Sequence, residues 1–199
     1  MKQPDLLIAI NPLIDAFNQH GIEYYISGSV AGSAYGIARA TLDVDIVATI
    51  EKRHVPLLLS ELSSQYYITA ESINEAITRQ SSFNMIHLET MIKIDIFILK
   101  ESEFAISAFQ RKVTDELDED FPRKYFLSSP EDIIINKLIW YNKGRRISDQ
   151  QWKDIVGILK VQAAQLDYPY IESWTQKLGL YPLYKKALDD AGIELCNPE

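Results

Sequence analysis

The sequence has little cysteine, no long apolar run and no excess of positive charge. Its 199 residues include one cysteine, Cys196, which excludes an internal disulfide framework and a multi-cysteine zinc site and fits a reducing compartment. No stretch approaches the roughly 18 uninterrupted apolar residues of a membrane span, and residues 1–17 lack the small-residue cleavage site of a signal peptide. We therefore expect a cytoplasmic protein that does not enter a membrane.

The charge balance also limits the class of protein. Lys and Arg total 20 and Asp and Glu total 28, which gives a net charge of −8. An acidic chain disfavours sequence-independent binding to nucleic acid through neutralisation of its phosphates, although a local basic groove remains possible. The hydrophobic fraction of 47% is that of a folded globular protein. A Gly-rich Walker motif and a Gly-x-Ser-x-Gly nucleophile elbow are both missing from the sequence.

Apolar periodicity predicts an α+β fold in two parts. The expected strands are 22–27, 44–50, 83–87, 91–99 and 125–127, and the expected helices are 6–17, a short one within 28–40, 52–64, 71–79, 129–142, 148–162, 170–178 and 182–191. Strands 83–87 and 91–99 are expected to form an antiparallel pair. The chain becomes wholly helical after residue 127, so we predict a core domain over 1–127 and a helical subdomain over 128–199.

Three aspartates are the main candidates for chemistry. Asp43 and Asp45 alternate with Val44 at the head of a strand, so both carboxylates lie on one face, about 6.6 Å apart along the chain. Asp95 interrupts a strand whose other face is an unbroken row of isoleucines. Carboxylates held this close repel each other unless a cation compensates, and hard oxygen ligands suit Mg²⁺. The sequence predicts a metal site made by Asp43, Asp45 and Asp95.

A small-residue turn precedes these carboxylates. Gly28 and Ser29 directly follow the first expected strand and open the segment 28–40. Glycine allows close backbone approach, and the free N–H groups at the start of a helix bind phosphate. The order of these elements, a strand, then the Gly28-Ser29 turn and then the Asp43-Val44-Asp45 pair, therefore predicts a phosphate site followed by a metal site.

This order resembles the motif of the nucleotidyltransferase superfamily, in which Gly-Ser, a spacer and Asp-x-Asp are followed by a third aspartate on a later strand. Here the spacer covers residues 30–42, and Arg39-Ala40-Thr41 precedes the aspartate pair as it does in many members. The resemblance covers about 22–99. The helical half, with Ser129-Pro130-Glu131-Asp132 and Lys137, is similar to small bacterial nucleotidyltransferase-like proteins that include abortive-infection toxins.

The resemblance implies a mixed sheet that carries the carboxylates on one face, with helices behind it and a helical subdomain. It also implies an ATP or other NTP substrate, with Asp43, Asp45 and Asp95 holding Mg²⁺, two ions in the usual mechanism. Gly28 and Ser29, with Arg39 and Thr41, would bind the nucleotide, and Lys137 would serve the nucleotide or the acceptor. Besides the three aspartates, the resemblance thus implies five site residues: Gly28, Ser29, Arg39, Thr41 and Lys137.

The expected reaction is transfer of a nucleoside monophosphate to a hydroxyl acceptor on a tRNA end, a protein or a small molecule. An antitoxin or regulator protein is an expected partner if the toxin similarity extends to function. Two alternatives stay open: a catalytically silent nucleotide-binding or interaction module, and a metal-dependent phosphodiesterase. The phosphodiesterase needs a water-positioning group that the sequence does not identify.

Overall fold

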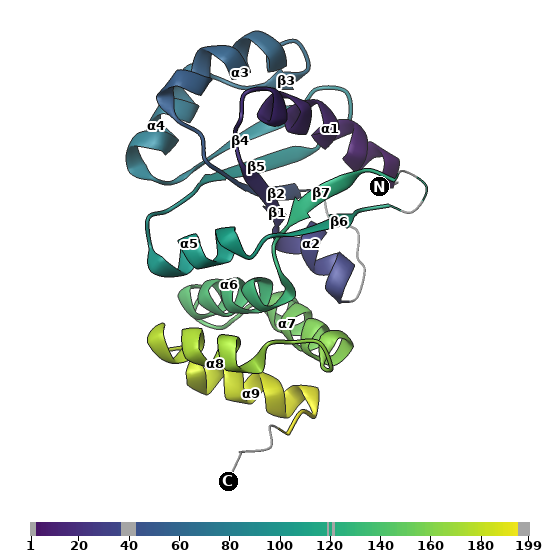
Figure 1. The fold of residues 1–199 in the computed structure, drawn as a ribbon, viewed down its shortest axis with the longest axis vertical. Coiled ribbons are helices and arrows are strands. Elements are labelled where there is room, and N and C mark those ends of the chain that lie inside the picture. The colour runs from purple at the N-terminus through teal and green to yellow at the C-terminus, as the bar shows by residue number, and fades with distance from the viewer. Residues whose placement is uncertain (1–2, 37–42, 119, 121, 195–199) are drawn as a thin grey trace. The chain divides into compact units, whose positions relative to one another are not determined.

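The computed structural model describes residues 3–36, 43–118, 120 and 122–194 (Figure 1). Its helices are α1 Gln3–Gln19, α2 Gly28–Tyr35, η1 Lys52–His54, α3 Val55–Leu62, α4 Ala70–Arg79, α5 Glu103–Gln110, α6 Pro130–Lys143, α7 Asp149–Gln162, α8 Tyr168–Lys177 and α9 Tyr181–Ala191. Its strands are β1 Tyr24–Ser27, β2 Asp43–Ala48, β3 Tyr66–Tyr67, β4 Ser82–His87, β5 Lys93–Ile98, β6 Val113–Glu116 and β7 Lys124–Leu127. The α+β class is confirmed.

The described strands form one mixed sheet in the order β3-β4-β5-β2-β1-β7-β6. β2 pairs with β5 in parallel and with β1 antiparallel, and β1 pairs with β7 in parallel. The remaining pairs, β3 with β4, β4 with β5 and β6 with β7, are antiparallel. The predicted antiparallel pairing of 83–87 with 91–99 is confirmed. The two central strands, β2 and β5, are also the strands that carry the candidate carboxylates.

One face of the sheet is the apolar core. The isoleucines of β5 alternate with Lys93, Asp95 and Phe97 and are buried, as are the alternate residues Val44 and Ile46 of β2. α1 packs on this face: the Tyr66 hydroxyl of β3 donates to the Ala9 carbonyl at 2.9 Å, and the rings of Phe17 and Tyr24 lie 5.9 Å apart. The carboxylates therefore lie on the opposite face of the sheet.

α5 covers part of that opposite face. Phe109 of α5 lies 5.6 Å, centroid to centroid, from the ring of Tyr25 on β1, which points to the same side as Ser27 because alternate residues of a strand share a face. α5 starts at the N-cap Ser102, whose hydroxyl accepts from the Ala105 N–H. This helix was not predicted, because its eight residues carry too short an apolar pattern.

Two strands were also not predicted. β3 is two residues long, and all four residues of β6 are exposed. An exposed strand that packs on nothing has no apolar alternation from which to be recognised, and β6 instead lies in a charged stretch next to β7. β1 begins at Tyr24 rather than at residue 22, and Pro12 lies inside a continuous α1.

The chain divides into two compact units. The first contains the described residues of 1–30 and 40–127, with the sheet, and the second contains those of 31–39 and 128–199. Most of α2 therefore belongs to the helical unit although it follows β1 directly. We retain 1–127 and 128–199 as proposed domains. In the described part of the chain, no helix is long and apolar enough to cross a membrane.

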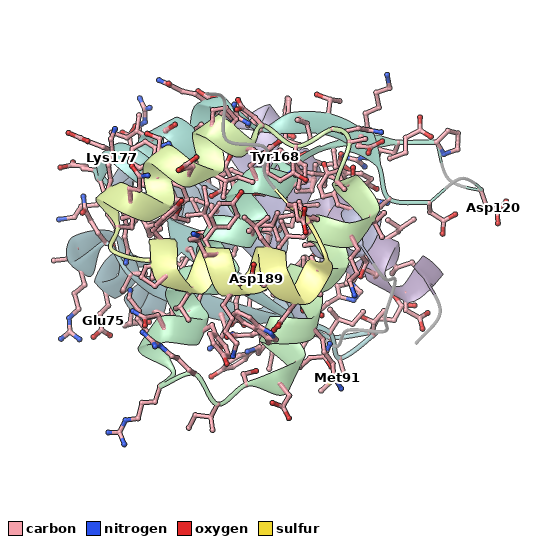
Figure 2. All side chains as sticks on the ribbon, turned by 90° about the horizontal axis from the view of Figure 1, so that it is seen from below. Glu75, Met91, Asp120, Tyr168, Lys177 and Asp189 are labelled. Carbon is pink, nitrogen blue, oxygen red and sulfur yellow. The ribbon has the colours of Figure 1, made fainter. Side chains whose placement is uncertain are left out.

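A buried carboxylate anchors the helical unit. Asp132, fully buried in the first turn of α6, accepts from the hydroxyls of Ser129 at 2.8 Å and Tyr170 at 2.7 Å. Ser129 in turn caps α6 by accepting from the Asp132 N–H. Figure 2 shows the two C-terminal helices, with Tyr168 at the start of α8 and Asp189 in α9. Because Tyr170 belongs to α8, Asp132 ties α8 to the start of α6.

Replacing this carboxylate is expected to destabilise the helical unit. Asp132→Ala removes the acceptor of one buried hydroxyl, that of Ser129, and of one half-buried hydroxyl, that of Tyr170, and should lower the free energy of unfolding by about 2–4 kcal/mol. Asp132→Asn keeps the shape and one acceptor oxygen and should cost about 1 kcal/mol or less. Urea unfolding followed by circular dichroism measures both variants, and equal losses for the two would show that the hydrogen bonds of Asp132 contribute nothing.

Candidate functional site

A row of polar side chains crosses four neighbouring strands on the face opposite the core. In register, Ser27 of β1 faces Asp45 of β2, Asp45 faces Asp95 of β5, and Asp95 faces Asn84 of β4. Directly facing residues in a sheet have their side chains on the same side and in reach of one another. The structure therefore places Asp95 beside Asp45 although they are far apart in sequence. Asp43 lies two residues before Asp45 on the same face.

Gly28 lies directly against Asp45. Its φ of +61° is in the left-handed region, and a Cβ built on it would lie 1.8 Å from Oδ2 of Asp45. Glycine is required here for the backbone angle and for space. Ser29 follows in the first turn of α2, so the predicted phosphate turn and the predicted metal pair are in contact through Gly28 and Asp45.

The remaining sequence-predicted site residues are Arg39, Thr41 and Lys137. Arg39 and Thr41 fall in 37–42, outside the described residues. Lys137 belongs to the helical unit, where it is 9% exposed and donates to Oδ2 of Asp154 at 2.8 Å. Gln150 donates to the second oxygen of the same carboxylate at 2.8 Å. Lys137 is thus a buried cation with a half-buried counterion.

Lys93 is a site residue that the sequence analysis did not single out. It faces Asp43 in register, and its ammonium forms an ion pair with Oδ2 of Asp95 at 2.6 Å. The pKa of Lys93 is raised, chiefly by this hydrogen bond and further by the negative charges of Asp95, Asp43 and Asp45, while burial acts the other way. The signal available in the sequence was the i, i+2 spacing of Lys93 and Asp95, which places both on one face of a strand.

This ion pair bears on the predicted metal site. Within the described ranges, no group of three or more His, Cys, Asp or Glu side chains is arranged to hold a metal ion. Mg²⁺ commonly takes only one or two carboxylates from a protein and completes its shell with water and substrate phosphate oxygens. Asp43 and Asp45 fit that donor set, and Asp95 is held by Lys93. The three-carboxylate site stays a prediction.

Comparison with solved structures confirms the expected nucleotidyltransferase fold. The antibiotic-resistance factor ANT(2'')-Ia in complex with adenylyl-2''-tobramycin matches with a TM-score of 0.57 and 13% identity, over 92% of this chain and 99% of that one. The solution structure of ANT(2'')-Ia gives 0.55 and 13% identity over 95% and 96%.

A fungal structure also matches. An antigenic nucleotidyltransferase-like protein from Paracoccidioides brasiliensis has a TM-score of 0.51 and 16% identity over 96% of this chain and 94% of that one. No family model and no curated protein matches the sequence. At identities this low the shared property is the fold.

Gly28→Ala tests the contact with Asp45. The variant should lose about 1–3 kcal/mol of stability and bind NTP at least about tenfold more weakly, because the new methyl group forces the Asp45 carboxylate aside. Thermal unfolding and titration with a fluorescent NTP analogue measure the two effects.

Gly21→Ala is the matched control. Gly21 has a φ of +65° and nothing lies within 4 Å of a Cβ at this position, so the control carries the same backbone strain without the steric clash. Equal NTP affinity in the two variants would show that the position of Asp45 does not matter for binding.

Lys93→Met tests how the ion pair affects metal binding. Removing the positive charge that pairs with Asp95 at 2.6 Å should raise the affinity of the carboxylates for Mn²⁺ about fivefold, as expected for an electrostatic interaction of about 1 kcal/mol in water. Electron paramagnetic resonance of free Mn²⁺ measures the affinity without turnover. Lys100→Met is the control, since Lys100 is exposed and lies outside the polar row; an unchanged or weaker affinity in Lys93→Met would contradict the expectation.

Proposed function

We propose that the protein transfers a nucleoside monophosphate from an NTP to a hydroxyl acceptor with release of pyrophosphate. The observation that carries the proposal is the placement of Asp43, Asp45 and Asp95 on one face of two parallel strands, with Gly28 against Asp45. A turn that admits phosphates beside paired carboxylates is what in-line displacement at a phosphorus atom needs.

In this proposal each residue of the carboxylate face has a separate role. Gly28 and Ser29 bind the β- and γ-phosphates at the start of α2, and Asp43 and Asp45 hold Mg²⁺. The metal supplies charge stabilisation for the attacking and leaving oxygens. Asp95 accepts the proton of the acceptor hydroxyl or joins the metal site. In either role the ion pair between Asp95 and Lys93 must first break.

In the proposed reaction, two lysine side chains neutralise the negative charge that develops on the phosphates. Lys93 is adjacent to the carboxylates in the sheet unit, and once released from Asp95 its ammonium is free to pair with a phosphate oxygen. Lys137 is retained as a candidate from the helical unit, with Asp154 as its partner before substrate binds. Arg39 and Thr41 remain proposed nucleotide ligands from the sequence motif.

The acceptor class is the least constrained part of the proposal. ANT(2'')-Ia, which shares the fold, has been observed with adenylyl-2''-tobramycin, so a small polyhydroxylated amine is the first acceptor to test. A tRNA end and a protein side chain are the others. A separate antitoxin or regulator stays a prediction from the resemblance to abortive-infection toxins.

One observation favours a second candidate, the silent nucleotide-binding module. Lys93 neutralises Asp95 at 2.6 Å, and a lysine that stayed there would leave the third carboxylate unable to act as a base or ligand. Nucleotide binding without transfer is the property that distinguishes this candidate.

The proposed reaction is tested with NTPs labelled at the α-phosphate, Mg²⁺, and tobramycin, bulk tRNA or cell lysate as acceptor. Asp43→Asn/Asp45→Asn should reduce label transfer at least about 100-fold, because metal stabilisation of the transition state contributes several kcal/mol. Asp189→Asn, an exposed position in α9, should transfer at the wild-type rate.

The outcomes separate the two candidates. Label on an acceptor from wild type and from Asp189→Asn, but not from the double variant, supports transfer. Binding of NTP by wild type with no label on any acceptor, nor on the protein itself, supports the silent module.

A further inference from the structure

A polar groove lies beside the carboxylate row, at the edge of the sheet. It has a volume of about 350 Å³ and runs between α4 and β4. The α4 side supplies Ser72, Glu75 and Arg79, and the β4 side supplies Ser82 and Asn84. The groove exists because β3, the next strand outward, is two residues long and pairs only with the far end of β4, at Ile86 and His87.

The floor of the groove is an unpaired strand edge. Ser81 accepts from the Ile98 N–H, and the His87 N–H donates to Ile92, both at 2.9 Å, so odd-numbered residues of this strand bond to β5. Alternate residues of an antiparallel strand direct their backbone groups to opposite sides. The N–H and C=O groups of Ser82 and Asn84 therefore point away from β5, and no group in the described part of the chain pairs with them.

We propose that this groove binds an extended peptide segment of a protein partner, which adds a strand to β4. The floor offers donors and acceptors at the two-residue repeat of a strand, which is the pattern that strand addition uses. Its walls are hydroxyls and the Glu75–Arg79 ion pair, 2.8 Å apart, so a polar peptide fits better than an apolar helix. The added strand would continue the line of β3.

The position of the groove would bring a bound peptide close to the carboxylate row. Asn84 faces Asp95 in register, so a strand added to β4 lies two strand spacings, about 10 Å, from β5. The partner segment would therefore lie at the border of the carboxylate face, where a protein acceptor or a protein regulator would be placed. The binding itself does not rest on the proposed nucleotidyl transfer.

The test is selection of a random heptapeptide display library on the immobilised full chain without nucleotide. Selected peptides are synthesised and their affinities measured by fluorescence polarisation. Asn84→Pro removes the outward N–H and leaves the bonds between β4 and β5 intact, so it should weaken binding at least about tenfold. Asn84→Ala keeps the backbone and should bind within about threefold of wild type.

Each outcome decides the proposal. Selected peptides that lose affinity for Asn84→Pro and keep it for Asn84→Ala support strand addition. Failure to select any peptide, or equal affinity for wild type and Asn84→Pro, overturns it. Ser82→Pro replaces Asn84→Pro if thermal unfolding shows that the latter does not fold. Binding should persist in Asp43→Asn/Asp45→Asn, which separates this result from the outcome of the transfer assay.

Discussion

The parallel pairing of β2 with β5 is the constraint on which the candidate site depends. It places Asp45 directly beside Asp95, two carboxylates that nothing in the local sequence brings together. The pairing is fixed by the other face, where Val44 and Ile46 meet Ile94 and Ile96 in the buried core. A slip of one residue would expose these apolar side chains and bury the aspartates, so hydrophobic burial on one face sets the geometry of the charges on the other.

The carboxylates on β2 and β5 repel each other, and the positive charge of Lys93 reduces this repulsion. Like charges on adjacent strands repel, and Lys93, on the same face of β5 as Asp95, compensates part of this charge. The ammonium occupies the position that a divalent cation would compete for. In the proposed function, binding of metal and nucleotide would exchange one cation for another at Asp95, and the site would favour ligands that bring their own positive charge. This holds for an active transferase and for a silent nucleotide binder, which differ in whether Asp95 is released.

Much of the fold and of the site could be predicted because their causes are local. The alternation of Ile92, Ile94, Ile96 and Ile98 defined a core strand, and Ser129 and Ser148 marked helix starts that the structure confirms. The parts that could not be predicted depend on partners distant in sequence. β6 is a strand only because β7 lies beside it, and the closeness of Gly28 to Asp45 arises from the pairing of β1 with β2.

The same sheet accounts for the difference between its two edges. Charged β6 occupies one edge, and acidic side chains such as Asp115 and Glu116 discourage pairing with another chain. At the other edge β3 ends after two residues, and Ser82 and Asn84 of β4 are small and polar and leave the backbone accessible. An edge of this kind, next to the face that carries the carboxylates, is a place where a partner strand can bind without disturbing the core. Since β4 lies next to β5, a strand bound there would reach Asp95 through a single intervening strand, and the edge and the carboxylate row would then act as one surface.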